Sequence, residues 1–173
     1  WLEKKHVTAL LAMAESARSV SHGKTALVIG GGMGRSPETQ EAIREFLSTN
    51  TLPAVIDADA IYALAKDPGV IKGENSLITP NTFEFYTLTG KEVYKLPDEE
   101  KIKIVQEQAE RFKTTILLKG RIDIISNGQE VALNKTGGPY LAKGGTGDTL
   151  SGIAGAFLAR GIDAFTAAQA AAY

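Results

Sequence analysis

Cysteine is absent from the 173 residues, and histidine occurs only twice. Without thiols the chain can form neither disulfide bonds nor thiolate metal sites, and a cysteine nucleophile is excluded. His6 lies at a polar helix start and His22 in a Ser-His-Gly turn, where a surface role is far commoner than metal binding. We therefore assign neither histidine to a metal. The lack of cysteine and of a signal-peptide pattern leads us to expect a cytoplasmic protein.

An excess of charge of either sign and a long apolar run are also missing. Nineteen Lys and Arg stand against twenty Asp and Glu, which gives a formal net charge of −1. A nucleic-acid-binding or membrane-surface protein would show a basic surplus, and a membrane span needs about 18 apolar residues in a row. We therefore expect a small-molecule substrate, with no nucleic-acid partner and no membrane association.

The length and the two ends bear on domain organisation. A chain of 173 residues, of which 43% are hydrophobic, suits one domain with one core. The chain begins at Trp1 without an initiator Met, and it ends at 167–173 in an Ala-rich helical pattern with no Gly, Asn or Pro to stop it. We expect residues 1–173 to be a single, partial domain of a longer polypeptide that is truncated here at both ends.

Short apolar runs alternate with helical patterns along the chain. Strands are expected at 25–29, 53–56, 76–78 and 115–118, and helices at 37–47, 61–65 and 98–112. This alternation predicts an α/β fold in which a mostly parallel, doubly wound sheet carries helices on both faces. Asn127-Gly128, between apolar runs at 122–125 and 130–133, predicts an antiparallel two-residue hairpin near the C-terminal part.

The most informative segment is 143–152, which holds four glycines and an aspartate. Gly145 to Gly147 can turn backbone N–H groups toward a ligand, and a helix expected at 149–159 adds the positive end of its dipole. We therefore expect an anion cradle for a phosphate, with a positive φ at Gly147. Asp148 is either a residue that stabilises the helix dipole or a base that takes a proton from an attacking hydroxyl.

Polar side chains follow several of the expected strands. Asp57 and Asp59 come after the second strand, and we expect one of them to face the crevice and the other to cap the next helix. Asn81 and Glu84, three residues apart, predict a capping box at a helix start. Lys119 follows three apolar residues and precedes a glycine, which a nearby phosphate explains better than an ordinary surface charge does.

Four segments together resemble the ribokinase-like superfamily. They are Gly144-Gly145-Thr146-Gly147-Asp148, Asn134-Lys135-Thr136-Gly137, Leu118-Lys119-Gly120, and Thr79-Pro80 before Glu84. Within the superfamily the chain is most similar to the ATP- or ADP-dependent NAD(P)H-hydrate dehydratases. Their G-P-G-L-G-R loop corresponds to residues 30–35, and their D-A-D-A segment to residues 57–60.

The resemblance implies an enzyme that repairs hydrated NADH and NADPH. In that family the hydrate hydroxyl is phosphorylated from ATP or ADP and then lost as phosphate. The resemblance makes Asp148 the catalytic base, in contact with the hydrate together with Gly34 and Asn81, and assigns Glu84 to Mg²⁺ bound with the nucleotide. The nucleotide-binding residues it implies are Lys119, Gly120, Arg121, Ile122, Asp123, Gly145, Thr146 and Gly147. We also expect a homo-oligomer.

The chain departs from the dehydratase pattern before the cradle, where Gly138, Tyr140 and Lys143 replace the family's usual Asn, Gly and Thr, and in a motif after the third expected strand. The family's T-P-H-P-G-E stands here as Thr79-Pro80-Asn81-Thr82-Phe83-Glu84, so Asn81 replaces a substrate-contacting His and Phe83 replaces Gly. Asn81 and Glu84 also match the N-x-x-E motif of the superfamily's sugar and vitamin kinases, so an alcohol kinase is the alternative. A nucleotide-binding module without chemistry is a third possibility, and the presence of Asp148 and Glu84 argues against it.

Overall fold

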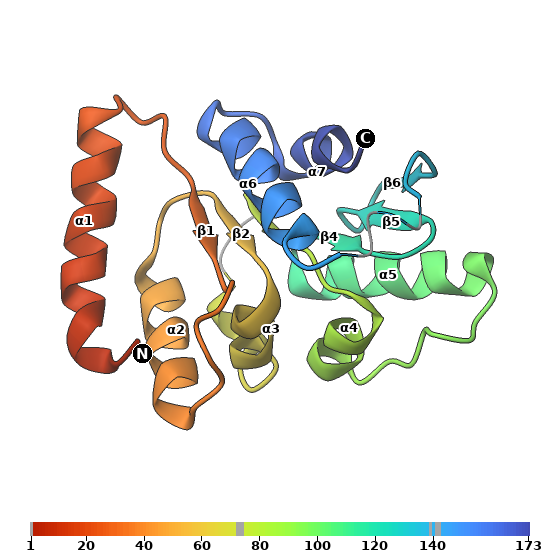
Figure 1. The fold of residues 1–173 in the computed structure, drawn as a ribbon, viewed down its shortest axis with the longest axis horizontal. Helices are drawn as coiled ribbons and strands as arrows, with labels where there is room; N and C mark the ends of the chain where they lie inside the picture. The colour runs from red at the N-terminus through yellow and green to blue at the C-terminus, as the bar shows by residue number, and fades with distance from the viewer. Residues whose placement is uncertain (1, 72–74, 139, 141–142) are drawn as a thin grey trace.

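The computed structural model describes residues 2–71, 75–138, 140 and 143–173. Within these residues strands and helices alternate (Figure 1). The strands are β1 (Leu27–Ile29), β2 (Ala54–Ile56), β3 (Ser76–Ile78), β4 (Thr115–Leu118), β5 (Asp123–Ser126) and β6 (Val131–Asn134). The α-helices are α1 (Val7–Val20), α2 (Pro37–Thr49), α3 (Ala58–Leu64), α4 (Thr82–Thr89), α5 (Asp98–Phe112), α6 (Thr146–Ala159) and α7 (Ala164–Ala172), and the short 3₁₀ helices are η1 (Lys4–His6) and η2 (Pro68–Val70).

The six strands form one sheet in the order in which they occur along the chain, β1 to β6. β1, β2, β3 and β4 are parallel, whereas β5 runs antiparallel to both β4 and β6. The helices that connect the parallel strands lie on one face, and α6 and α7, which follow β6, cover the other (Figure 1). The predicted α/β fold, with helices on both faces and an antiparallel hairpin, is therefore confirmed.

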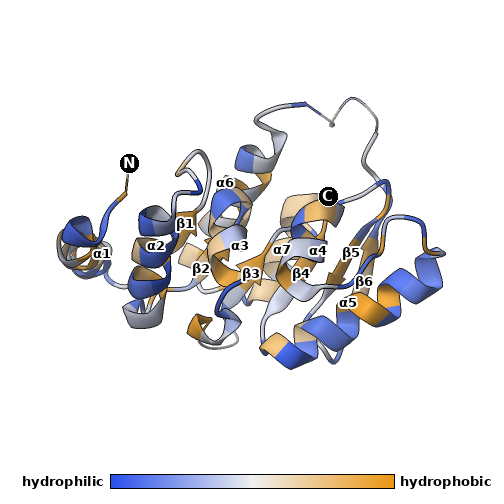
Figure 2. Cartoon of the chain, turned by 90° about the horizontal axis from the view of Figure 1, so that it is seen from below, coloured by the Kyte–Doolittle hydropathy of each residue, from blue (hydrophilic) through white to orange (hydrophobic). Residues whose placement is uncertain are grey.

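Alternation along each strand sends side chains to two different cores. Ile29, Ile56 and Ile78 pack with α2 and α3 on one face. Val55 and Leu77, the neighbours of these isoleucines in sequence, pack with α6 and α7 on the other. A third cluster joins Ile116, Leu118 and Ile124 to Phe85 of α4 and Val105 of α5. Because the strands are buried on both faces, their sequences are continuous apolar runs without alternation. Figure 2 shows these hydrophobic strands in the middle of the molecule.

Two helices begin three residues earlier than the sequence patterns predict. α6 begins at Thr146 rather than 149, so Gly147 and Asp148 are helical residues of its first turn. α3 begins at Ala58 rather than 61. In both cases small or acidic residues ahead of the apolar stripe are helical, and a search for apolar periodicity misses them. No helix among the described residues combines the length and the apolar character that a membrane crossing requires.

The hairpin between β5 and β6 is present, but its tip lies one residue later than predicted. Ser126 pairs with Val131, and the Asn127 N–H still donates to the Glu130 carbonyl at 3.4 Å. The two residues at the tip are therefore Gly128, with φ +93°, and Gln129. The Asn127 side chain accepts hydrogen bonds from the Gln129 and Glu130 N–H groups, which fixes Asn127 on the strand side of the turn.

Candidate active site

The candidate site lies where the first four strands end. The residues that directly follow these strands are Gly30, Asp57, Thr79 and Lys119. Because parallel strands place their carboxyl ends at one edge of a sheet, these residues line up along that edge. The first turns of α6 lie against this row of residues, since Ser151 of α6 donates a hydrogen bond to Asp57.

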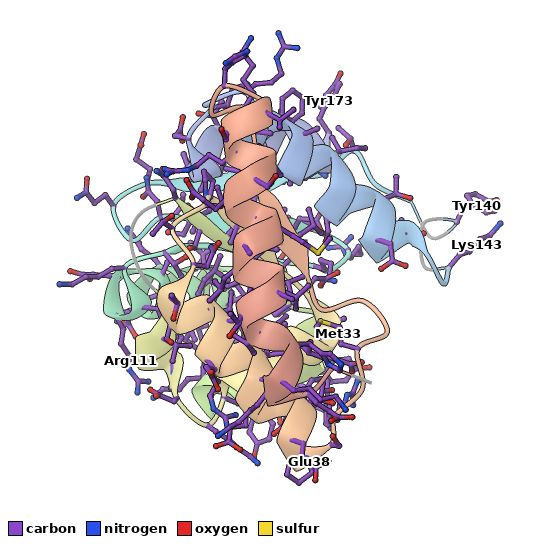
Figure 3. The ribbon with its side chains drawn as sticks, turned by 90° about the vertical axis from the view of Figure 1, so that its left-hand side faces the viewer. Met33, Glu38, Arg111, Tyr140, Lys143 and Tyr173 are labelled. Carbon is purple, nitrogen blue, oxygen red and sulfur yellow. The ribbon has the colours of Figure 1, made fainter. Side chains whose placement is uncertain are left out.

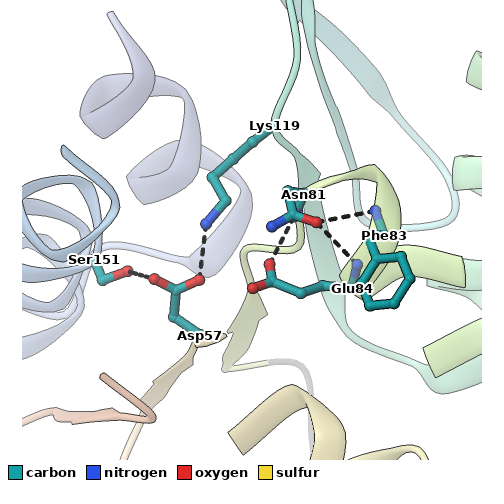
Figure 4. Close-up of polar contacts among 6 residues, drawn as sticks. All are labelled: Asp57, Asn81, Phe83, Glu84, Lys119 and Ser151. Carbon is teal, nitrogen blue, oxygen red and sulfur yellow. Dashed lines mark hydrogen bonds and ion pairs between the residues drawn. The ribbon is translucent and has the colours of Figure 1, made fainter. Parts of the chain in front are cut away.

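Asp57 is a buried carboxylate with two partners from distant parts of the chain. Its side chain is only 6% exposed. Lys119 Nζ lies 2.9 Å from Asp57 Oδ1, and Ser151 Oγ donates to Asp57 Oδ2 at 3.1 Å (Figure 4). A buried charge is tolerated where a counter-ion and hydrogen bonds satisfy it, as they do here. Asp57 is therefore the aspartate that faces the crevice, and its side chain does not cap α3.

Asp59, the second aspartate, holds the glycine loop that follows β1. Its Oδ2 accepts the Gly34 N–H at 2.8 Å, and its Oδ1 lies 2.6 Å from Arg35 Nε. The Arg35 guanidinium also stacks 3.6 Å above the centroid of the Tyr62 ring. The hydrogen bond to Asp59 raises the pKa of Arg35 above its ordinary value. The expectation that one aspartate caps the next helix through its side chain is wrong, because Asp59 reaches back to the loop instead.

The glycine loop also contacts Asp148. A Cβ added at Gly31 would lie 2.9 Å from Asp148 Oδ1, so the carboxylate lies directly against the Gly31 backbone. A Cβ at Gly30 would lie 1.7 Å from the Asp57 carbonyl oxygen, which leaves no space for a side chain there. A cavity of about 410 Å³ opens beside Asp148 along β1, with Asp57 and Ser151 also in its wall. Sequence reasoning missed Gly31, because only the fold brings it to Asp148.

The predicted anion cradle forms the start of α6. Gly145 is the N-cap residue with φ +91°, so the left-handed residue is Gly145, and the prediction of a positive φ at Gly147 is wrong. The Thr146 N–H donates to the Lys143 carbonyl at 3.3 Å. The N–H groups of Gly147 and Asp148 have no hydrogen-bond acceptor within the described residues. These two donors and the helix dipole suit a phosphate oxygen.

Gly147 connects the cradle to the buried ion pair. A Cβ added there would lie 3.5 Å from both Asp57 Oδ2 and Lys119 Nζ. The first turn of α6 therefore rests directly on the charged atoms of these two side chains. The structure thus brings the predicted residues Lys119, Gly147 and Asp148 together, and it adds Asp57 and Ser151.

Asn81 and Glu84 form the predicted capping box at the start of α4. Asn81 Oδ1 accepts the Phe83 and Glu84 N–H groups, each at 2.9 Å, and Glu84 Oε2 accepts the Asn81 N–H at 2.8 Å (Figure 4). Glu84 is buried at 7% exposure. In the same row, the fully buried Thr79 Oγ1 has no hydrogen-bond partner among the described residues. The N-x-x-E pattern is therefore accounted for by helix capping.

A magnesium ion bound with a nucleotide fits this donor set. Glu84 Oε1 makes no hydrogen bond within the described residues, so one carboxylate oxygen is left for a cation. The described residues contain no group of three His, Cys, Asp or Glu that could hold a metal by itself. Mg²⁺ commonly takes one or two carboxylates and completes its octahedron with phosphate oxygens and waters.

The turn between β4 and β5 holds the other predicted nucleotide residues. The Gly120 N–H donates to Asp123 Oδ1 at 3.0 Å, and Asn134 Nδ2 donates to Asp123 Oδ2 at 3.0 Å. The Asp123 carboxylate is thus used to build the turn. Arg121 is exposed and Ile122 is partly buried. This turn follows Lys119 directly and lies at the same edge of the sheet.

Two further features lie away from this site. Lys143 and Tyr140, on the segment before α6, point away from the body of the molecule (Figure 3). A larger cavity, of about 920 Å³, opens at the amino ends of the strands between Thr115, Gly128 and Asp163. Although this cavity is the larger of the two, we do not assign the active site to it, because the cradle and the Asp148 carboxylate lie at the opposite edge of the sheet.

Comparison with known proteins agrees with this geometry. The model of the NAD(P)H-hydrate dehydratase family matches residues 3–173. A curated relative, the Bifunctional NAD(P)H-hydrate repair enzyme Nnr of Pyrobaculum aerophilum, is 41% identical over 174 residues, which cover 99% of this chain and 32% of that protein. The chain thus spans about a third of the length of the curated relatives it matches.

Two solved structures share the fold. The ADP/ATP-dependent NAD(P)H-hydrate dehydratase from Bacillus subtilis, co-crystallized with ATP/Mg²⁺, has a TM-score of 0.72 and 33% identity, covering 86% of this chain and 52% of that one. A ribokinase-like superfamily protein from Enterococcus faecalis has a TM-score of 0.71 and 26% identity, covering 91% of this chain and 56% of that one. The predicted ribokinase-like fold is confirmed, and the match over residues 3–173 shows that the chain belongs to the NAD(P)H-hydrate dehydratase family.

Proposed function

We propose that this chain carries the catalytic domain of a nucleotide-dependent dehydratase that restores NADH and NADPH from their hydrates. One observation carries the proposal: Asp148 lies in the first turn of α6, which holds the cradle, and its carboxylate lies directly against the Gly31 backbone. A carboxylate beside an anion cradle repels phosphate, so a chemical task is needed to explain its place. The names of the Pyrobaculum and Bacillus relatives support the same reaction.

In the proposed reaction Asp148 is the general base. It accepts the proton of the hydrate hydroxyl while that oxygen bonds to the terminal phosphoryl group of the nucleotide. The C–O bond of this phosphate ester then breaks, and phosphate leaves with the electron pair. The neighbouring ring carbon gives up a proton to water, and the double bond of NADH or NADPH forms. The products are the reduced cofactor, free phosphate and the shortened nucleotide, so atoms and charges balance.

The cradle and the two neighbouring strand ends hold the nucleotide in this proposal. Gly145 and Thr146 form the turn that leaves the backbone N–H groups of Gly147 and Asp148 free for a phosphate, Lys119 supplies a positive charge, and the turn 120–123 borders the site. Mg²⁺ neutralises phosphate charge when bound, and Glu84 is the residue that would hold it. Support for ATP or ADP with Mg²⁺ comes from the co-crystallized Bacillus structure.

Gly34 and Asn81 remain the proposed contacts to the hydrated dinucleotide. The Gly34 N–H already donates to Asp59, so a substrate contact at Gly34 would be made by its carbonyl oxygen or its Cα instead. Asn81 Oδ1 caps α4, which leaves its side-chain amide N–H₂ as the donor for a substrate. A capping box at Asn81 and Glu84 is compatible with an alcohol kinase and with a dehydratase, so this motif does not decide between them.

The decisive experiment compares two reactions in the full-length protein. Hydrated NADH, ATP or ADP, and Mg²⁺ are supplied, and the return of NADH is followed by its near-ultraviolet absorbance. The proposal expects NADH to return, phosphate to be released, and no phosphorylated cofactor to accumulate. Stable phosphorylation of a sugar or vitamin alcohol, without recovery of NADH, would promote the kinase. Nucleotide binding with neither reaction would identify a module that has lost its chemistry.

Four statements about the whole protein are proposals as well. Residues 1–173 are one partial domain of a longer polypeptide, which agrees with the fraction of each relative that the chain spans. The protein forms a homo-oligomer, works in the cytoplasm, and acts on a small molecule rather than on nucleic acid or a membrane. Light scattering of the full-length protein tests the first two of these, because it reports both mass and assembly.

A further inference from the structure

The proposed reaction leaves the buried Asp57 without a role. Its carboxylate lies beneath Gly147 of the anion cradle, since a Cβ at Gly147 would come within 3.5 Å of Asp57 Oδ2. A negative charge there opposes phosphate binding. Burial of a carboxylate is also costly unless its partners are well placed.

The partners of Asp57 come from the two elements that build the cradle. Lys119, at the end of β4, brings the cation, and Ser151, on the second turn of α6, brings a hydroxyl. These residues are 62 and 94 positions away from Asp57 in the sequence. A single carboxylate therefore joins the ends of β2 and β4 to the helix that carries Asp148. The Lys119 ammonium is held in the same place, 3.5 Å from the Cβ position of Gly147.

We propose that Asp57 is a positioning residue of the dehydratase, which holds the Lys119 ammonium and the start of α6 in fixed places beneath the phosphoryl groups. This inference rests on the proposed function. Without Asp57, the long side chain of Lys119 is free to follow any bound phosphate. The ammonium then favours the ground state of the nucleotide as much as the transition state, which strengthens binding and slows turnover.

The test uses Asp57→Asn, which keeps the shape of the side chain and can still accept the hydrogen bond from the Ser151 hydroxyl. Nucleotide affinity is measured by calorimetry with Mg²⁺ and ADP on the full-length protein. We expect affinity to rise about tenfold, the effect of one unit charge several ångströms away at an effective dielectric constant in the tens, and to rise less at high salt. Asp163→Asn, at the opposite edge of the sheet, is the matched control and should change affinity less than about twofold. Unchanged or weaker binding by Asp57→Asn overturns the inference.

A double-mutant cycle tests whether Asp57 acts through Lys119. We expect Asp57→Asn to lower kcat about tenfold in the wild-type background and less than about twofold in Lys119→Met, because the side chain to be positioned is then gone. Equal losses in both backgrounds indicate a merely structural role and overturn the inference. If Asp57→Asn does not fold, Ser151→Ala replaces it. That variant should lower kcat about threefold with ADP affinity within about twofold, and full turnover would overturn the inference.

Failure of the proposed function gives a different result. A wild-type protein that does not return NADH from its hydrate refutes the dehydratase. The binding comparison between Asp57→Asn and Asp163→Asn does not depend on that turnover, so it still decides whether the Asp57 charge acts on the cradle.

Discussion

Asp148→Asn separates the proposed chemistry from folding. The side chain is exposed in the first turn of α6 and makes no hydrogen bond within the described residues. Asn has nearly the same shape, so the close contact with Gly31 is kept. The substitution removes only the interaction of a negative charge with the helix dipole, which lowers the free energy of unfolding by about 0.3–1 kcal/mol. In a chain of this size that lowers Tm by at most about 4 °C.

The effect on turnover should be far larger. A positioned general base contributes about 10²- to 10⁴-fold, which corresponds to about 3–5 kcal/mol of transition-state stabilisation. Nucleotide affinity should change less than in Asp57→Asn, because the cradle donors are the backbone N–H groups of Gly147 and Asp148, and because water screens the exposed Asp148 charge more than the buried Asp57 charge. The variant is therefore expected to fold, to bind nucleotide and to be nearly inactive.

The assay follows NADH recovery from its hydrate with nucleotide and Mg²⁺, alongside a thermal melt and calorimetry of nucleotide binding. Asp98→Asn is the matched control, because Asp98 also lies in the first turn of a helix, α5, and is exposed. It should share the small change in Tm and keep full activity. Near-wild-type turnover by Asp148→Asn would refute the base assignment and leave Asp148 as a residue that only stabilises the helix dipole.

Three further predictions concern stability. Asn81→Ala removes the acceptor of two backbone N–H groups at α4 and should cost about 1 kcal/mol in urea unfolding, whereas Asn81→Asp should keep most of it; equal stability of all three proteins would contradict the capping box. Gly30→Ala places a Cβ 1.7 Å from the Asp57 carbonyl oxygen, so a loss of at least about 1–3 kcal/mol is expected, and an unchanged melt would refute that contact. The Thr166 backbone N–H lowers the pKa of Asp163, so the stability that the charged carboxylate adds is complete above its ordinary pKa and is lost as the pH falls through the lowered value; Asp163→Asn should flatten this acid dependence, and identical pH profiles would disprove it.

The sequence alone determined the alternation of strands and helices, the caps of α4 and α7, and the glycine turn that begins α6. Apolar runs of three to five residues between helical patterns are local signals, and the strands form where these runs predict them. Asn81 with Glu84, and Asp163 before α7, act as caps because a cap depends only on residues within one turn. The glycine segment before Asp148 begins a helix for the same local reason.

Local signals were less accurate at the ends of elements. The small residues Thr146 and Gly147 are helical although the apolar stripe of α6 begins later, and the left-handed residue is Gly145. The hairpin tip moves to Gly128 and Gln129, because the register of the whole β5–β6 pair, rather than the Asn-Gly dipeptide, sets the position of the turn.

The tertiary structure alone decided which side chains meet at the site. Asp57 and Asp59 are equivalent in the sequence pattern, yet one pairs with Lys119 and Ser151 and the other holds Gly34. The two roles differ because Asp57 directly follows β2 whereas Asp59 lies in the first turn of α3, and because the order of strands places the end of β2 near the end of β4 and under α6. Lys119 and Ser151 are separated from Asp57 by 62 and 94 positions in the sequence, and contacts over such separations produce no local pattern in the chain. They can be identified only when the sheet register and the helix packing are known.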